Sequence, residues 1–437
     1  MTFEDLKLGN PLQNAIEDLE YVYPTPIQVA AMPVVTSGKD VVGIAQTGTG
    51  KTFAYLLPIL KQLKYQEKKQ PRVLIMVPTR ELVVQVCNEI EKLTKYMSVK
   101  TGGVYGGTNI NTQKKLVHEG LDIVVATPGR LLDLALTGVL RLKSVQKLVI
   151  DEVDEMMNLG FRGQLNDVLD LLPEKRQNIL FSATLTPDVE KVVDDFFSFP
   201  EVIEIAAHGT PLERIEQFGY VVNNLETKVN LLKYLLKGEE YKKVLVFVGN
   251  KRLADKLYVD LEPLFGEELD VIHSNKSQNY RLNVIKAFES GKVRALVATD
   301  IIARGIDIQD VSHVINMDIP EEAATYIHRI GRTGRHDKFG VSIAISSPVE
   351  EERVEHLESL MKQKINWLEK PEEVEEGKAI LNEDQFYAGD KTYVKVNDVL
   401  AQSQGAFHEK KAKNQKVNLG SAYYQKKKAE RKKKRRR

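Results

Sequence analysis

The sequence lacks the features that would place the protein outside the cell or in a membrane. A single cysteine, Cys87, excludes an intramolecular disulfide and a cysteine-based zinc site. No apolar run reaches the roughly 18 residues that a membrane-spanning helix needs. The residues from Met1 to Asp5 do not follow the basic and then apolar order of a signal peptide. We therefore expect a cytoplasmic protein with no membrane partner.

Net charge is nearly absent from the whole chain but not from its C-terminal end. The 437 residues carry a formal net charge of +1, whereas residues 404–437 contain 14 Lys and Arg against 2 Asp and Glu, which leaves −11 for the rest. Such a segment cannot bury a core, so we expect a disordered basic tail that binds RNA or docks on a ribonucleoprotein. The same composition also suits a solubilising tail or a nuclear import address.

Short apolar runs of strand length alternate with helix-length amphipathic stretches through most of the chain. A hydrophobic content of 42% over 437 residues is enough for two α/β domains of about 150 to 200 residues each. The runs are 41–45, 73–77, 123–126, 148–150 and 179–181 in the first half, and 244–248, 270–272, 295–298, 314–316 and 342–345 in the second. This alternation predicts βαβ units and parallel sheets, whose ligands bind beyond the carboxyl ends of the strands.

Gly209 and Pro211 interrupt the alternation and predict a hinge. The expected segments are a first domain at 1–207, the hinge at 208–213, a second domain at 214–368, an acidic-to-mixed linker at 369–403 and the basic tail at 404–437.

One polar cluster after a predicted strand has the composition of a phosphate-binding loop. The segment 45–52 reads Ala-Gln-Thr-Gly-Thr-Gly-Lys-Thr, and Gly48 and Gly50 let the backbone curl around phosphate oxygens before a helix begins. Lys51 would reach the outer phosphates, and the hydroxyl of Thr52 would ligate Mg²⁺. Ala45 stands where the strict pattern has glycine. The alternative interpretation is a chance Gly-rich turn.

A second cluster, Asp151-Glu152-Val153-Asp154, supplies carboxylates at the end of another predicted strand. Asp151 is the expected magnesium ligand, because Mg²⁺ keeps several waters and needs few protein carboxylates. Glu152 is the expected base that orients and deprotonates the attacking water. An Asp-Glu pair alone is commonly a solvated acidic loop, but together with Lys51 it predicts a nucleotide triphosphatase site.

The second half of the chain has no phosphate loop of its own, so we expect it to serve the nucleotide of the first. Segment 326–335 places arginines among glycines, and Arg332 and Arg335 are candidate arginine fingers. Such a residue can be worth roughly 10³ to 10⁵ in the rate of phosphoryl transfer. In isolation, a stretch of this composition is more often a solvated loop or a contact to a phosphate backbone.

In this combination and order, the motifs resemble those of the DEAD-box ATP-dependent RNA helicases of helicase superfamily 2, from residue 3 to about residue 365. The resemblance implies an α/β fold with two tandem RecA-like domains, ATP and Mg²⁺ as cofactors, and RNA as the partner. Residues 3–28 resemble the family's Q motif, with Glu20 where the family usually has glycine. Val153 replaces the alanine of the family name.

The resemblance also implies a role for individual residues. Lys51, Asp151, Glu152, Arg332 and Arg335 would be catalytic. The expected nucleotide contacts are Phe3, Tyr21, Gln28, Ala45, Gln46, Thr47, Gly48, Thr49, Gly50, Lys51, Thr52, Gly305 and Asp307. The expected RNA contacts are Pro78, Thr79, Arg80, Gly106, Gly107, Thr127, Gly129, Arg130, Arg281 and Thr299. The residues expected to couple the ATP state to the grip on RNA are Asp154, Ser182, Thr184 and His328.

The function implied is ATP hydrolysis that locally unwinds short RNA duplexes or remodels RNA and RNA–protein complexes, by a monomer. Contacts to phosphates and 2′-hydroxyl groups would bind single strands without reading their sequence. Two alternatives stay open at this point. One is an ATP-gated RNA clamp or annealing chaperone, and the other is a DNA helicase built on the same two-domain engine.

Overall fold

The computed structural model describes residues 1–45, 48–66, 70–205, 214–300, 311–334 and 339–377. The predicted hinge at 208–213 and the basic tail at 404–437 lie outside these ranges. So do five of the predicted site residues: Gln46, Thr47, Gly305, Asp307 and Arg335. In the described part of the chain, no helix is long and apolar enough to cross a membrane.

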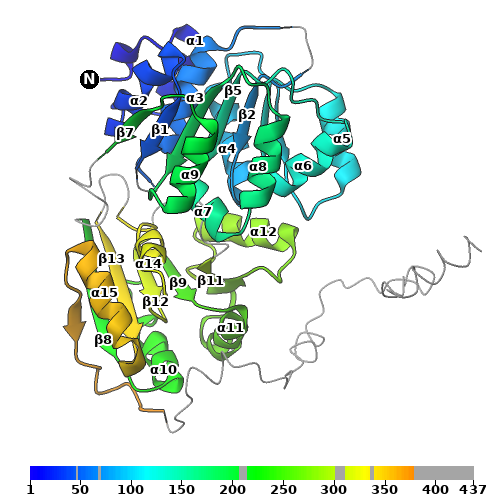
Figure 1. Cartoon of the computed structure of the whole chain (residues 1–437). Helices are drawn as coiled ribbons and strands as arrows, with labels where there is room; N and C mark the ends of the chain where they lie inside the picture. Colours follow the sequence, from blue (N-terminus) through cyan, green and yellow to red (C-terminus); the bar gives the residue numbers. More distant parts are fainter. Residues whose placement is uncertain (46–47, 67–69, 206–213, 301–310, 335–338, 378–437) are drawn as a thin grey trace, which may run out of the picture. The chain divides into compact units, whose positions relative to one another are not determined.

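The first sheet has seven parallel strands in the order β3-β4-β2-β5-β6-β1-β7 (Figure 1). Its strands are β1 (Val41–Ile44), β2 (Val73–Met76), β3 (Thr101–Val104), β4 (Ile123–Ala126), β5 (Lys147–Asp151), β6 (Gln177–Ser182) and β7 (Glu201–Glu204). The inner strands are buried on both faces, as their continuous apolar runs predicted.

The second sheet repeats this architecture, with seven parallel strands in the order β10-β11-β9-β12-β13-β8-β14. Its strands are β8 (Ile215–Val221), β9 (Val244–Val248), β10 (Leu269–Ile272), β11 (Ala295–Thr299), β12 (His313–Asn316), β13 (Gly340–Ser346) and β14 (Asn366–Leu368). Position by position, each strand of the first sheet has a counterpart here, so that β1 corresponds to β8 and β5 to β12. All ten predicted strands are confirmed, and β3, β7, β8 and β14 are additional.

Helices cover both faces of the first sheet. Alternate residues of its strands point to opposite faces, so apolar side chains on both faces are buried by helices. Val41 packs into one hydrophobic cluster and its neighbour Val42 into the other. The first cluster is covered by η1 (Glu4–Leu6), α1 (Asn10–Asp18), α2 (Pro26–Ser37), α3 (Lys51–Gln62) and α4 (Arg80–Leu93). The second is covered by α5 (Ile110–His118), α6 (Pro128–Leu136), α7 (Val153–Asn158), α8 (Arg162–Leu171) and α9 (Pro187–Phe196).

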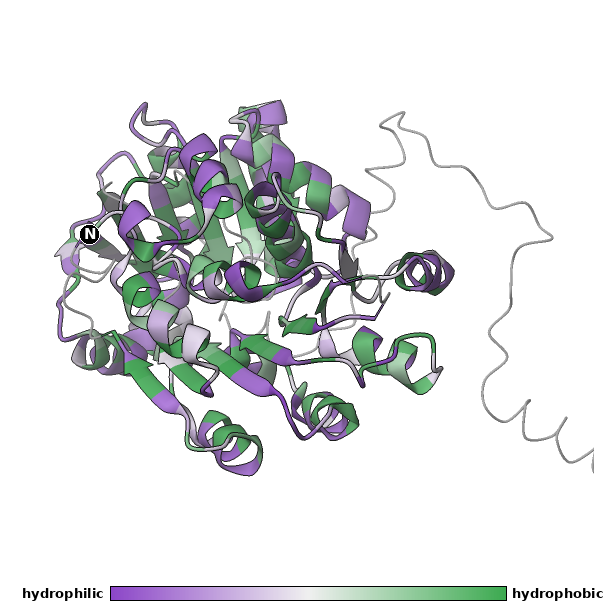
Figure 2. Cartoon of the chain, turned by 90° about the horizontal axis from the view of Figure 1, so that it is seen from above, coloured by the Kyte–Doolittle hydropathy of each residue, from purple (hydrophilic) through white to green (hydrophobic). Residues whose placement is uncertain are grey.

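The second sheet is covered in the same manner. Its helices are α10 (Leu225–Leu235), α11 (Lys251–Phe265), η3 (Gly266–Glu268), α12 (Gln278–Glu289), α14 (Ala323–Ile330), η4 (Pro348–Glu350) and α15 (Glu351–Met361). One cluster joins α12 to β9, β10 and β11, and another joins α14 and α15 to β8 and β13. The helices carry both hydrophilic and hydrophobic residues along their length (Figure 2), as expected of amphipathic helices that cover a sheet.

Because every strand pair of the first sheet is parallel, the carboxyl ends of its strands lie on one side, and the loops that follow the strands leave from that side. The residues predicted to be catalytic or to couple ATP state to RNA binding in the first half of the chain follow β1, β5 and β6, which are neighbours in the sheet. The predicted RNA-contacting loops follow β2, β3 and β4, which are also neighbours. The predicted residues therefore form two adjacent groups at the carboxyl ends of the strands of the first sheet.

Candidate active site

The loop after β1 presents a buried cation. Lys51 is the first residue of α3, and Gly48 and Gly50 on its N-terminal side adopt positive φ angles of 81° and 87°. The Lys51 ammonium is buried and has no hydrogen-bond partner among the described residues. A buried ammonium without a partner is costly, so this position suits an anionic ligand such as a phosphate.

Gln28 connects the start of α2 to this loop. Its Oε1 accepts a hydrogen bond from the Thr25 amide at 2.9 Å, and its Nε2 donates to the Gly50 carbonyl at 3.1 Å. A Cβ atom at Gly50 would collide with Nε2, so this contact needs glycine at that position. The Gln28 amide retains one N–H and acceptor capacity for a further ligand, such as the edge of a base.

The aromatic residues of the expected base site differ in exposure. Phe3 is only 3% exposed and lies in the hydrophobic core. Tyr21 is 41% exposed and packs against Phe53 edge to face, with ring centroids 5.6 Å apart. The structure therefore leaves the ring of Tyr21 open to a base and covers most of Phe3. The turn before Tyr21 forms without glycine, because Glu20 itself adopts the left-handed conformation, with φ of 59°.

Asp151, the last residue of β5, has both carboxylate oxygens in hydrogen bonds. Oδ1 accepts from the Glu152 amide at 2.9 Å, and Oδ2 accepts from the Tyr55 hydroxyl at 3.1 Å. Burial raises the pKa of Asp151, while the nearby Lys51 charge opposes that rise. Burial, followed by the Asp151 charge, raises the pKa of Tyr55 well above its usual value, so its hydroxyl stays a proton donor.

Glu152 has the properties of a proton acceptor held in a strained position. It is the N-cap of α7 and adopts a left-handed conformation with φ of 52°, which is uncommon for a residue other than glycine. Its Oε2 is buried and has no hydrogen-bond partner in the described part of the chain. Burial raises the pKa of Glu152, with the Lys51 charge acting in the opposite direction. A carboxylate of this kind suits general base catalysis.

The predicted magnesium ligands fit the metal only together with a nucleotide. No group of three or more His, Cys, Asp or Glu side chains that could hold a metal ion occurs within the described residues. Mg²⁺ is commonly held by one or two carboxylates together with substrate phosphates and water. Asp151 and the Thr52 hydroxyl supply such a sparse set of oxygen ligands beside Lys51.

Asp154 joins the loop after β5 to the loop after β6. Its Oδ2 accepts hydrogen bonds from the Ala183 amide at 3.2 Å, the Thr184 amide at 3.0 Å and the Thr184 hydroxyl at 3.0 Å. Ser182 donates from its hydroxyl to the Thr184 carbonyl at 2.7 Å. Three of the four residues predicted to couple ATP state to RNA binding are therefore in one hydrogen-bond network.

Helices and loops around both sheets line a pocket, whose residues are Lys51, Glu152, Asp154, Glu155, Ala183, His328 and Arg332. The Arg332 charge, like the larger effect of Lys51, opposes the rise that burial causes in the pKa of Glu152. His328 interacts through Nδ1 with Glu155 Oε1 at 3.1 Å. Sequence reasoning missed Glu155, whose only local signal is a second carboxylate directly after Asp154.

The loops after β2, β3 and β4 bring most of the predicted RNA contacts together. Thr79 caps α4, and the Arg80 guanidinium lies so close to Gly107 that a Cβ atom there would collide with it. Arg130 donates to the Gln113 side chain at 2.9 Å and to the Thr108 carbonyl at 3.2 Å. The remaining members of this group are Pro78, Gly106, Thr127 and Gly129.

Two predicted RNA contacts belong to the second sheet. Thr299 is the last residue of β11 and is buried. Arg281 on α12 is also buried and lies 3.1 Å from the Glu81 carboxylate, to which Gln278 donates a hydrogen bond at 3.1 Å. Glu81 therefore neutralises Arg281 in this structure, and its contact with RNA stays a prediction.

Two family models match the chain: DEAD/DEAH box helicase over residues 25–192 and helicase conserved C-terminal domain over residues 227–337. The chain is 37% identical over 370 residues to the DEAD-box ATP-dependent RNA helicase CshA of Geobacillus kaustophilus, which covers 85% of this chain and 79% of that protein. It is 40% identical over 376 residues to CshA of Streptococcus pneumoniae, with coverages of 86% and 71%.

Solved structures agree with these relatives. S. cerevisiae Dbp5 bound to RNA and ADP BeF3 aligns with a TM-score of 0.78 at 27% identity, over 84% of this chain and 96% of that one. The DEAD-box helicase Mss116 bound to ssRNA and UDP-BeF aligns with a TM-score of 0.76 at 28% identity, over 84% and 79%. The predicted tandem RecA-like fold is confirmed, and the chain belongs to the DEAD-box ATP-dependent RNA helicases, a family of ATP-hydrolysing enzymes.

Proposed function

We propose that this enzyme uses ATP hydrolysis to open short RNA duplexes locally or to remodel RNA and RNA–protein complexes. The observation that carries this proposal is the pocket in which Lys51 and Glu152 of the first sheet meet His328 and Arg332 of the second. A site with parts from the helices and loops around both sheets is complete only when these parts approach each other. Binding of ATP and RNA can therefore be coupled to ATP hydrolysis through their closure.

Each part of the pocket has a task in hydrolysis. Lys51 and the amides of its loop bind the ATP phosphates, and Tyr21 and Gln28 bind the base. Asp151 and Thr52 would hold Mg²⁺, which would supply positive charge to neutralise the phosphates. Glu152 orients the attacking water and accepts its proton. Arg332, together with Arg335 outside the described residues, stabilises the charge that develops during transfer.

The hydrogen bonds of Asp154 support a route from the nucleotide to RNA. Because Asp154 holds the Ala183 and Thr184 amides, a movement of the loop after β5 also moves the loop after β6. His328 adds a contact from the second sheet through Glu155. The loops after β2, β3 and β4 lie along the same edge and supply amides, hydroxyls and arginines that suit an RNA backbone. The RNA-bound states of Dbp5 and Mss116 support this assignment.

The test is the steady-state rate of ATP hydrolysis without nucleic acid, with single-stranded RNA and with DNA of matched sequence, in magnesium buffer. We expect stimulation by RNA and none by DNA, because 2′-hydroxyl contacts distinguish the two. Equal stimulation by DNA would indicate a DNA helicase. Tight ATP-dependent RNA binding without stimulated turnover would indicate a clamp.

An annealing activity is the second candidate, and the charge of residues 404–437 favours it, because 14 Lys and Arg there can bring two RNA strands together. Deletion of these residues should lower RNA affinity and its dependence on salt, while maximal RNA-stimulated ATP hydrolysis is retained. Strand annealing without ATP that disappears on deletion would support this candidate. An unchanged salt dependence would reject a role of the tail in RNA binding.

A further inference from the structure

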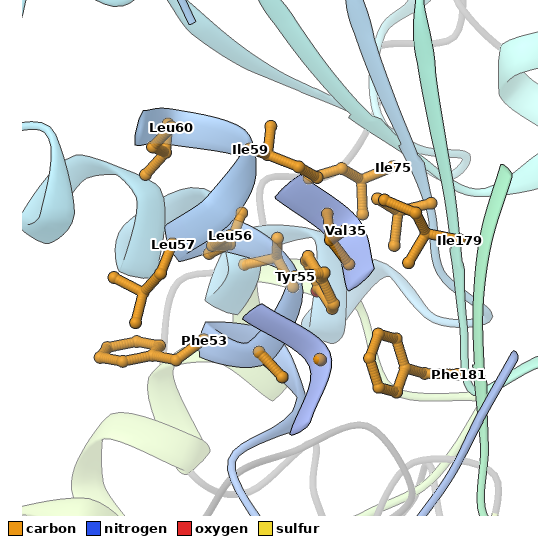
Figure 3. Close-up of a cluster of buried hydrophobic side chains, with 14 of the residues drawn as sticks. Val35, Phe53, Tyr55, Leu56, Leu57, Ile59, Leu60, Ile75, Ile179 and Phe181 are labelled. Atoms are coloured by element: carbon orange, nitrogen blue, oxygen red, sulfur yellow. The ribbon is translucent and has the colours of Figure 1, made fainter. Parts of the chain in front are cut away.

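The hydroxyl of Tyr55 lies at a position where packing does not need it. Tyr55 is on α3, is fully buried, and belongs to a cluster that is otherwise apolar, with Val35, Ile179 and Phe181 as members (Figure 3). A hydroxyl placed among apolar side chains is unfavourable unless it forms a hydrogen bond. Phenylalanine would fill the same space, so the hydroxyl has to be explained by its polar contacts.

Those contacts are with the two residues proposed to hold Mg²⁺. The hydroxyl donates to Asp151 Oδ2 at 3.1 Å, and the Thr52 side chain also forms a hydrogen bond with it. The other oxygen of Asp151 accepts from the Glu152 amide at 2.9 Å. With one donor on each oxygen, the carboxylate cannot rotate without losing a hydrogen bond.

The ring that carries this hydroxyl is itself held in place. Tyr55 packs against Phe181 of β6, with ring centroids 5.7 Å apart and planes inclined by 44°. Phe181 in turn lies over Gly43 of β1, where a Cβ atom would collide with its ring. Two strands, β1 and β6, together with helix α3 therefore fix the hydroxyl relative to the end of β5.

We propose that Tyr55 is a positioning residue of the metal site, whose hydroxyl fixes the orientation in which the Asp151 carboxylate meets the Mg²⁺ of bound ATP. This inference rests on the proposed function of the Lys51 pocket. Mg²⁺ demands a nearly ideal octahedral arrangement of ligands, so a carboxylate held in one orientation binds it better than one that rotates. The hydroxyl acts through Asp151 and Thr52 and touches no reacting atom.

The experiment measures binding of a non-hydrolysable ATP analogue to the full chain, first in EDTA and then over a titration of Mg²⁺. Tyr55→Phe removes the hydroxyl and keeps the ring. Tyr326→Phe is the matched control, because Tyr326 is also fully buried, with its hydroxyl 3.5 Å from Ser342 on the second sheet. Thermal unfolding of both variants measures the general effect of losing a buried hydroxyl.

We expect Tyr55→Phe to need about 10-fold more Mg²⁺ for half-maximal binding, within the range that loss of a partner of a metal ligand produces. Its affinity in EDTA should equal that of the wild type, and Tyr326→Phe should match the wild type in both conditions. An unchanged Mg²⁺ requirement overturns the inference, and so does an equal loss of affinity with and without metal. If wild-type binding does not depend on Mg²⁺, the proposed function of the pocket fails as well.

Discussion

A lysine is buried on each of the helices that follow the corresponding strands β1 and β8. Of these two lysines, only Lys228 forms a hydrogen bond through its ammonium with the described residues. Lys228 on α10 is fully buried and donates to Glu350 Oε2 at 2.9 Å and to the Met317 carbonyl at 3.0 Å. The Lys51 ammonium, at the start of α3, has no hydrogen-bond partner in the described residues. Lys228 is held by hydrogen bonds within the fold, whereas Lys51 lies near the Asp151 and Glu152 charges but makes no hydrogen bond with the described residues, which suits an anionic ligand.

The carboxylates beyond β5 and β12 differ in the same sense. Asp318, just after β12, lies 3.2 Å from the buried guanidinium of Arg329. Oδ1 of Asp318 and Oε2 of Glu152, which lies just after the corresponding β5, are both buried without a hydrogen-bond partner among the described residues. The two carboxylates differ in the ion pair that Asp318 forms through Oδ2. Two sheets with the same strand order thus differ in the ion pairs and hydrogen bonds of one lysine and one carboxylate, and this difference supports the proposal that the first sheet holds the nucleotide.

Breaking the comparison at the carboxylates should have a large effect on the rate of hydrolysis. Glu152→Gln should lower RNA-stimulated turnover by about 10² to 10⁴, the contribution of a general base. ATP and RNA should still bind, because the amide has nearly the same shape, and the closed complex should persist. Single-turnover hydrolysis and nucleotide affinity measure the two effects separately.

Asp318→Asn is the control for this variant, since it changes the carboxylate at the corresponding strand end. It should weaken the hold on Arg329 without changing the rate of the chemical step. Normal turnover by Glu152→Gln would mean that another group accepts the proton.

The two lysines should respond to the same substitution in opposite ways. Lys228→Met leaves Glu350 buried without its partner and should lower the free energy of unfolding by about 3 to 5 kcal/mol. Lys51→Met removes a cation that makes no hydrogen bond with the described residues, so it should lower stability less than Lys228→Met while ATP binding is lost. Urea unfolding and nucleotide titration of both variants test this. Equal destabilisation by the two substitutions would show that Lys51 has a structural partner.

The smallest effect concerns two glycines at corresponding strands. Gly43 of β1 lies under the fully buried ring of Phe181, and Gly219 of β8 lies under the half-buried ring of Trp367 on the edge strand β14. Gly43→Ala should lower the free energy of unfolding by about 1 to 3 kcal/mol, because a packed core cannot accept the methyl group. Gly219→Ala should cost less, since an edge ring can shift toward solvent. A larger cost at Gly219, measured by urea unfolding, would contradict this reasoning.

The sequence predicted the inner strands because burial on both faces leaves continuous apolar runs. It did not predict β3, β7 and β14, three of the four strands at the edges of the sheets, although it did predict the fourth, β10. β3 begins Thr101-Gly102-Gly103, and only one residue of β7 is buried, so neither has such a run. β8 lies next to an edge, and Glu216, Gln217 and Gly219 interrupt its apolar residues. Weak apolar patterns are expected wherever a strand is covered on one side only.

For the site, the sequence predicted the residues that local spacing identifies, such as Lys51 and Asp151. It did not predict the hydrogen bond between Tyr55 and Asp151 or the contact between Glu155 and His328, which join residues 96 and 173 positions apart. It also did not predict the burial of Phe3, because that burial depends on how η1 packs against residues distant in the sequence. Motifs reveal which groups perform chemistry, whereas their supporting contacts depend on the fold.

The central claim is that the second sheet, which has no phosphate loop, completes the active site of the first. The most direct test is single-turnover hydrolysis of bound ATP by Arg332→Ala in the presence of RNA. The matched control is Arg353→Ala, which removes an exposed arginine of the second domain. Arg332→Ala should slow the chemical step by about 10³ to 10⁵ while retaining ATP and RNA affinity, and Arg353→Ala should match the wild type. An unchanged chemical step in Arg332→Ala would contradict the account.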